Sequence, residues 1–218
     1  MINLEYQLVA YHDNQINRYW LTKPKLKWSN KKLQQKDLTV TNNLAQIVTK
    51  DLSQRFNQLI INEHQVQFNF PKIINQKLVL PVIIYLTQEQ TQSIIANNNS
   101  SNGQFFNDQQ IPDNLPKQLK SDNQDLKKFL NDDLQAHALK NIHYLLPKTF
   151  TAKQLSALLT LITGRFIKRN NIRRDFLNQA KVVGKDRSHA GYPSNLFQYS
   201  GQKFDIKDKP KLKGPHKI

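Results

Sequence analysis

The stretch from Thr149 to Tyr199 constrains the fold more than any other part of this chain of 218 residues. It begins with a stripe of apolar residues at helical spacing, formed by Leu155, Leu158, Leu159 and Ile162. Thr151 before this stripe favours a helix N-cap, and Gly164 after it stands where a left-handed residue ends a helix. A second helix, predicted from Lys168 to Gln179, and a hairpin containing Gly and Pro follow. This order predicts a small winged helix-turn-helix domain.

The predicted second helix has one apolar side and one basic side. Ile172 and Phe176 are four residues apart and share the apolar side. The polar side carries Lys168, Arg169, Asn170, Asn171, Arg173 and Arg174. Because Arg, Lys and Asn are common contacts to phosphates and base edges, we expect this side to bind DNA. The other expected DNA contacts are Lys153 on the preceding helix and Arg187, His189 and Tyr192 in the hairpin.

Positive charge is concentrated in the same part of the chain. Residues 136–218 contain 17 Lys and Arg against four Asp, a net charge of +13 out of the formal +16 of the whole chain. A local positive surface attracts polyanions and gains affinity from counterion release. Double-stranded DNA is therefore the expected partner, with structured RNA as the alternative. A solvated basic surface without a partner is the simplest competing interpretation.

The first half of the chain has the pattern of a mixed α/β domain. Its predicted elements are a hairpin turning at His12 to Gln15, a helix from Asn42 to Asn57 capped by Thr41 or Asn42, and strands from Gln65 to Phe70 and from Lys77 to Leu86. Two loops are expected, at Lys23 to Lys36 with Trp28 as an apolar anchor, and at Asn97 to Asp125. A connecting helix is predicted from Asp122 to Leu139, continuing toward Tyr144.

Common catalytic arrangements are missing from the sequence. There is no Cys, no Gly-rich phosphate loop, and the six His are scattered. We expect no catalytic residues, no bound metal and no cofactor. The longest apolar run, Leu78 to Leu86, contains Pro81 and is too short to span a bilayer, and no signal peptide is recognisable. A cytoplasmic protein without a membrane partner is therefore expected.

Two motifs resemble the Nudix-related transcriptional regulators of bacteria. The first combines Leu146-Pro147-Lys148-Thr149-Phe150-Thr151 with the basic helix, and is similar to the family's "LPxxFTLxxLQ" and "DKRNFRRKxL" segments. The second, Gly191-Tyr192-Pro193-Ser194-Asn195-Leu196-Phe197, is similar to the family's "GRPAxLY" wing, with Tyr192 where the family has Arg. The resemblance covers the last third of the chain. It implies a Nudix-like α/β domain followed by a winged helix.

The Nudix box itself is degenerate. Its "REUxEExG" segment, where U is a bulky apolar residue, aligns with Lys50-Asp51-Leu52-Ser53-Gln54-Arg55-Phe56-Asn57. Gln54 and Arg55 stand where two carboxylates hold divalent cations in a Nudix hydrolase. The sequence therefore predicts a Nudix-like domain without hydrolase activity. The alternatives are an unrelated α/β dimerisation module and a hydrolase with an unusual metal site.

The resemblance implies a DNA-binding transcriptional regulator, a repressor, that forms a homodimer and responds to a nucleotide or sugar-phosphate effector. The expected domains are a Nudix-like domain at 1–121, a connecting helix at 122–145, a winged helix at 146–204 and a basic tail at 205–218. An RNA-binding or ribosome-associated protein is the alternative.

Overall fold

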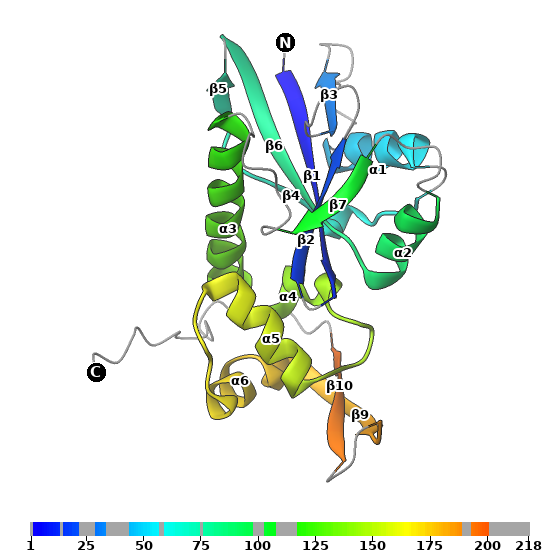
Figure 1. Ribbon diagram of the computed structural model, residues 1–218, viewed down its shortest axis with the longest axis vertical. Coiled ribbons are helices and arrows are strands. Elements are labelled where there is room, and N and C mark those ends of the chain that lie inside the picture. Colours follow the sequence, from blue (N-terminus) through cyan, green and yellow to red (C-terminus); the bar gives the residue numbers. More distant parts are fainter. Residues whose placement is uncertain are drawn as a thin grey trace, which may run out of the picture. The chain divides into compact units, whose positions relative to one another are not determined.

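The computed structural model divides the chain into two compact units, Met1–Lys120 and Ser121–Ile218 (Figure 1). It describes residues 2–13, 15–21, 29–33, 44–56, 59–74, 76–97, 103–107, 117–188 and 193–200. Thr41, Asn42 and Trp28, together with the 205–218 tail, lie outside these ranges, so the predictions made for them stay predictions. We describe each unit by itself.

The first unit is built on a mixed sheet around one long strand, β1 (Ile2–His12). One side of β1 pairs in parallel with β6 (Lys77–Tyr85). Its other side pairs antiparallel with β3 (Ser29–Leu33) and, further along, with β2 (Gln15–Leu21). Beyond β2 lies β7 (Gly103–Asn107), and beyond β6 lie β4 (Val66–Phe68) and β5 (Lys72–Ile74).

Two helices cover one face of this sheet, α1 (Leu44–Arg55) and α2 (Gln88–Ala96) (Figure 1). Alternate residues of β1, from Leu4 to Ala10, and of β6 point to this face and are buried with Val48 and Leu52 of α1. Ile94 of α2 joins the same core. Apolar residues that recur with a period of two in the strands and at helical spacing in α1 therefore meet in one cluster.

The predicted hairpin, the α1 helix and the strands β4 and β6 are confirmed. The two loop predictions are wrong in part, because β3 lies within 23–36 and β7 within 97–125. Both strands lie at an edge of the sheet, and neither has a clear alternating apolar pattern, so their pairing to β1 and β2 decides their structure. The sequence analysis also missed β5 and α2, although Thr87 and Gln90 form a capping box at the start of α2.

The second unit begins with the long helix α3 (Lys117–His137), followed by α4 (Leu139–Ile142) and the 3₁₀ turn η3 (His143–Leu145). The predicted continuous helix toward Tyr144 is wrong, because Ala138 has φ 49° and ψ −120° and interrupts it. The short strand β8 (Phe150–Thr151) leads into α5 (Ala152–Thr163) and α6 (Arg169–Asp175). Strands β9 (Ala180–Asp186) and β10 (Ser194–Tyr199) form an antiparallel hairpin, and β10 also pairs with β8.

The second unit therefore has the element order expected of a winged helix. One detail differs from the sequence prediction. The helix predicted from Lys168 to Gln179 ends at Asp175, Phe176 leaves helical geometry with φ −129°, and a 3₁₀ turn, η4 (Leu177–Gln179), follows. Phe176 is fully buried, so core packing at this position takes precedence over a longer helix. None of the helices in the described residues is long and apolar enough to cross a bilayer.

Candidate nucleic-acid interface

Helix α5 is fixed at both ends by local hydrogen bonds. At its start, the Thr151 hydroxyl accepts from the Gln154 amide at 3.2 Å, and the Gln154 side chain accepts from the Thr151 amide at 2.8 Å. At its end, Gly164 has φ 67° and its amide donates to the Thr160 carbonyl at 2.9 Å. The predicted cap and terminator are confirmed, and the predicted core stripe is buried: Leu155, Leu158, Leu159 and Ile162.

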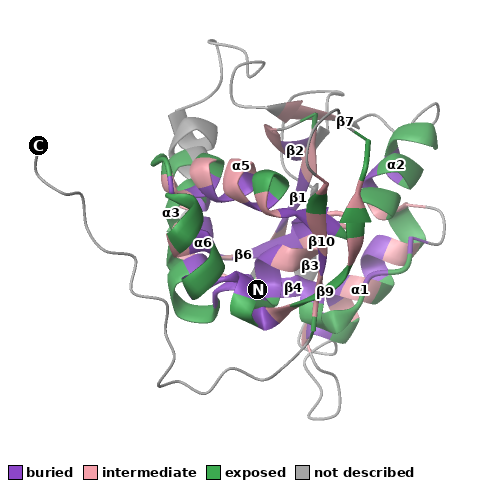
Figure 2. Cartoon of the chain, turned by 90° about the horizontal axis from the view of Figure 1, so that it is seen from below, coloured by how far each residue is buried: buried purple, intermediate pink, exposed green. Residues whose placement is uncertain are grey.

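Helix α6 places its apolar and basic residues on opposite sides, as the spacing predicts. Ile172 and the following Phe176 are 1% and 0% exposed. The basic and amide side chains point outward: Lys168, Arg169, Asn170, Arg173 and Arg174 are exposed and Asn171 is half-buried. Figure 2 shows the same division into buried and exposed faces on α5. The burial of the apolar pair fixes which side of α6 faces outward.

The three arginines of α6 are not equivalent. Arg174 donates through Nη2 to Oδ2 of the buried Asp175 at 2.8 Å, and its Nε bonds the other carboxylate oxygen. Among the described residues, no carboxylate forms an ion pair with Arg169 or Arg173. A guanidinium carries five N–H donors, so Arg174 keeps some of them for an outside partner. Arg169 and Arg173 keep all of theirs.

The hairpin of β9 and β10, which follows α6 in the sequence, carries further cationic side chains. Lys185 Nζ donates to the Asn195 side chain at 2.6 Å across β9 and β10, which cross-links the two strands. Arg187 follows β9 and is exposed, as is Lys153 on α5. His189 and Tyr192 lie outside the described residues, so their predicted DNA contacts stay predictions. Val182 and Val183 of β9 are 55% and 43% exposed.

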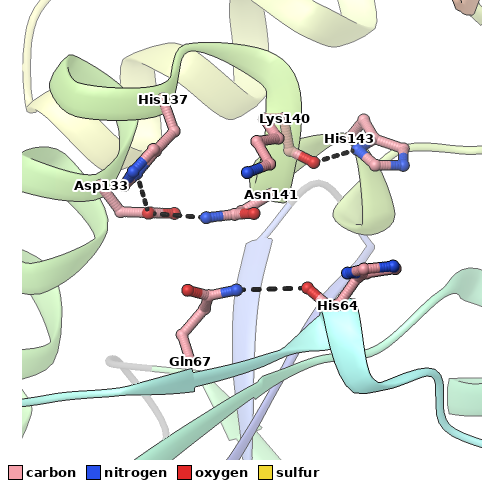
Figure 3. A network of polar contacts seen from close by, with 7 residues as sticks. All are labelled: His64, Gln67, Asp133, His137, Lys140, Asn141 and His143. Carbon is pink, nitrogen blue, oxygen red and sulfur yellow. Dashed lines mark hydrogen bonds and ion pairs between the residues drawn. The ribbon is translucent and has the colours of Figure 1, made fainter. Parts of the chain in front are cut away.

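A polar cluster at the junction of α3 and α4 was not anticipated from the sequence (Figure 3). The buried Asp133 carboxylate accepts from Asn141 Nδ2 at 2.8 Å and lies 2.9 Å from His137 Nδ1. These partners lie on either side of Ala138, whose positive φ is unusual for a residue other than Gly. Asp133 therefore joins the two helices across the irregular residue. A pattern of Asp, His and Asn at i, i+4 and i+8 is the sequence signal that could have indicated it.

His143 packs between two aromatic rings in the second unit. Its ring lies 4.1 Å from the Tyr199 ring and 4.0 Å from the Tyr144 ring, centroid to centroid. Nδ1 donates to the Lys140 carbonyl at 2.7 Å and lies 3.1 Å from the Leu139 carbonyl (Figure 3). Burial lowers the pKa of His143, and the two carbonyls oppose that shift. This ring connects η3 with the last residue of β10, a structural role.

The degenerate Nudix box lies on α1 of the first unit. The buried Asp51 carboxylate forms an ion pair with Arg55 Nε at 2.8 Å, and the Arg55 guanidinium lies 5.7 Å from the centre of the Tyr6 ring. Burial and the neighbouring Asp51 charge raise the pKa of the Tyr6 hydroxyl. Asp51 is therefore engaged with residues of its own unit, while Gln54 is exposed. Asn57 lies outside the described residues.

No cation site is assembled elsewhere in the described part of the chain. Within those residues, no three His, Asp or Glu side chains come close enough to hold a metal ion. In the first unit, the backbone carbonyl of His64 accepts from Gln67 Nε2 at 3.2 Å (Figure 3).

Comparison with known proteins gives structural matches only. No family model matches the chain, and no curated protein matches its sequence. The fold is similar to that of Shewanella oneidensis NrtR, solved in complex with a 27-mer DNA, at a TM-score of 0.69 and 14% identity over 92% of this chain and 94% of that one. A second crystal structure of the same protein matches equally well.

A MutT/nudix family protein from Enterococcus faecalis is also similar, at a TM-score of 0.68 and 11% identity over 91% of this chain and 87% of that chain. At these identities the similarity establishes the fold and leaves the activity to be tested. It extends over both units, whereas the sequence motifs covered only the last third. The chain therefore has the fold of the Nudix-related regulators, a Nudix-like α/β unit followed by a smaller helical unit.

Proposed function

We propose that this protein is a DNA-binding transcriptional regulator, a repressor, whose second unit reads duplex DNA as a winged helix. The proposal rests on one observation: the basic side of α6, the helix that follows the turn at Gly164, is exposed. A helix presented in this way fits the major groove, where its first residues reach base edges. The fold shared with a regulator that was solved on DNA supports the same conclusion.

The roles of the individual residues follow from their positions. Arg169 and Arg173 lie one turn apart on α6, and each can reach a guanine edge or a phosphate. Lys168, Asn170 and Asn171 extend the same surface. Arg174 contacts a phosphate with the donors that Asp175 leaves. The remaining proposed contacts belong to residues outside α6 and position the domain on the DNA phosphate backbone. They are Lys153, Arg187, His189 and Tyr192.

We further propose that the first unit has no catalytic role. A Nudix hydrolase needs several carboxylates around a hard cation, and here Gln54 and Arg55 replace two of them. The remaining Asp51 is buried and paired with Arg55. The unit, at 1–121, serves dimerisation and can bind a nucleotide or sugar-phosphate effector. Residues 122–145 connect it to the winged helix at 146–204 and its basic tail at 205–218, in a cytoplasmic regulator.

Selection of bound fragments from random duplex DNA, followed by fluorescence anisotropy on the enriched site, tests the proposal. Arg169→Ala and Arg173→Ala should each weaken the selected site by about 1–3 kcal/mol and change binding to random DNA little. Lys153→Ala is the matched control for a backbone contact. It should weaken all duplexes alike and lower the slope of log affinity against log salt by about one.

Three results would count against the assignment. If neither arginine variant changes affinity for the selected duplex, α6 is not the reading element. If no duplex is enriched while structured RNA binds tightly, the protein belongs to the RNA-binding alternative, for which a basic winged helix is equally suited. If calorimetry with ADP-ribose, NAD and sugar phosphates gives no heat, the first unit binds none of these effectors, and dimerisation is the one role left for it.

A further inference from the structure

One large apolar side chain of the second unit is exposed directly before helix α6. Phe166 is 80% exposed and lies in the segment that joins α5 to α6. A single exposed Phe is common on a protein surface. Phe166 differs from such a residue in two respects: the backbone on both sides of it is held by local contacts, and its neighbours are the cations of the proposed DNA-binding surface.

The backbone on either side of Phe166 is fixed. Before it, the Thr163 hydroxyl accepts from the Arg165 amide at 3.3 Å. After it, Ile167 is buried, and the Lys168 carbonyl accepts the first hydrogen bonds of α6. Phe166 is exposed, Ile167 buried and Lys168 exposed, the alternation that side chains of an extended segment show. Phe166 therefore projects away from the core, on the same side as Lys168.

The proposed docking of α6 brings this segment close to the DNA. In a helix-turn-helix, the first residues of the second helix reach base edges in the major groove. Phe166 lies three residues before Arg169, the first residue of α6, so the two are at most about 10 Å apart along the chain. Base pairs are stacked about 3.4 Å apart. The Phe166 ring can therefore reach a base within about three base pairs of the one that Arg169 contacts.

Thymine is the one base that offers this ring an apolar partner. In the major groove its C5-methyl group stands among hydrogen-bond donors and acceptors, and a Phe ring can contact this methyl group. Residues 165–174 carry five Lys or Arg and no carboxylate. A protein partner that covered Phe166 would have to desolvate the cations beside it, whereas a duplex brings phosphates to both sides of the groove. Charge therefore favours DNA as the partner of this side chain.

We propose that Phe166 is a specificity-determining residue that contacts the methyl group of a thymine near the base pair bound by Arg169. This role rests on the proposed function and adds a base preference that the basic side chains of α6 do not supply. DNA that reaches Arg169 also reaches Phe166, since only Ile167 and Lys168 separate them in the sequence. In a dimer on a symmetric site, each half-site should contain one such thymine.

Selection from random duplex DNA, with the parent protein and with Phe166→Ala, tests the proposal. The parent protein should enrich a thymine within about three base pairs of the position whose preference disappears in Arg169→Ala. Phe166→Ala should lose the preference for that thymine alone. Phe70→Ala is the matched control, since Phe70 is also highly exposed, at 86%, and belongs to the first unit. It should enrich the same site as the parent protein.

Replacement of the selected thymine by deoxyuridine removes the methyl group alone and tests the contact directly. Fluorescence anisotropy should show a roughly fourfold loss of affinity for the parent protein, the value of one buried methyl group. Phe166→Ala should bind both duplexes with the same affinity, because the two changes remove one contact. Phe166→Lys should also bind both equally, although its added charge raises the affinity for all duplexes.

Several outcomes would overturn the proposal. One is a selected site whose affinity does not depend on any thymine methyl group, and another is a Phe166→Ala variant that keeps the methyl dependence of the parent protein. Unfolding of both Phe166 variants, followed by circular dichroism, would show that the side chain belongs to the core. A change in sedimentation without a change in the selected site would show that Phe166 binds protein instead.

Failure of the proposed function is distinguishable from failure of this role. If the parent protein enriches no duplex, the DNA-binding assignment is removed, and the thymine contact with it. If a site is enriched and depends on Arg169 but on no thymine methyl group, α6 reads DNA and Phe166 does not.

Discussion

Two glycines of the second unit should respond to alanine with opposite signs. Gly164 has φ 67°, and an added Cβ would meet nothing within 4 Å, so its substitution isolates the backbone effect. Left-handed geometry costs an L-residue about 1–2 kcal/mol. Alanine also lowers the entropy of the unfolded chain, which offsets about 0.4–1 kcal/mol. Gly164→Ala should therefore lower the free energy of unfolding of the second unit by about 0.5–1 kcal/mol.

Gly184 on β9 is the contrasting case. Its backbone is not left-handed, and an added Cβ would lie 3.8 Å from Leu196 Cδ1, an ordinary van der Waals contact. Only the entropic effect is left, so Gly184→Ala should stabilise by about 0.4–1 kcal/mol. Gly164→Asn should fall between the two, because Asn tolerates left-handed geometry better than Ala does.

Urea unfolding of the full chain can measure both effects. Both tryptophans, Trp20 and Trp28, belong to the first unit, so their fluorescence follows that unit, while circular dichroism at the helix band follows both. A transition seen by dichroism and not by fluorescence reports the second unit. If the two alanine variants shift this transition in the same direction, the left-handed geometry at Gly164 is not what ends α5.

Two further outcomes are expected. The protein should show no diphosphatase activity on ADP-ribose with Mg²⁺ or Mn²⁺, and turnover that disappears in Asp51→Ala would falsify our interpretation of α1. The second unit should lose stability as the pH falls. The pKa of His143 in the folded chain is lowered below its ordinary value, so the unfolded chain binds the proton more readily. The stability that is present above pH ~6.5 is therefore lost as the pH falls through the lowered pKa. His143→Phe should flatten this dependence in thermal melts, and an unchanged pH profile would show that His143 is not the group responsible.

The parts of the fold that were predicted from the sequence are those set by local patterns. The period of α5, the Thr151 cap and the Gly164 terminator each act within a few residues, and the structure has all three. The basic side of α6 was predictable for the same reason, since Ile172 and Phe176 fix its orientation.

The features that the sequence analysis missed depend on distant partners. Strands β3 and β7 have little apolar periodicity, and their pairing to β1 and β2 makes them strands. The short length of α6 follows from the burial of Phe176 in the core. The spacing of the residues does not tell which arginine of α6 pairs with Asp175, and in the structure it is Arg174. The break between α3 and α4 at Ala138 has no Gly or Pro beside it, the residues that usually indicate the end of a helix.

The position of β1 has a consequence for how the chain acquires its structure during synthesis. Ile2 pairs with Leu78, 76 residues later. The side of β1 that pairs in parallel with β6 therefore stays unpaired until β6 has left the ribosome. Closing a loop of that length costs entropy before any contact repays it, and such topologies fold slowly. The hairpin of β9 and β10 closes over a few residues by comparison. Strand β1 therefore depends on a part of the chain that is made much later, and a nascent chain halted before β6 would expose the apolar face of β1 to chaperones or aggregation.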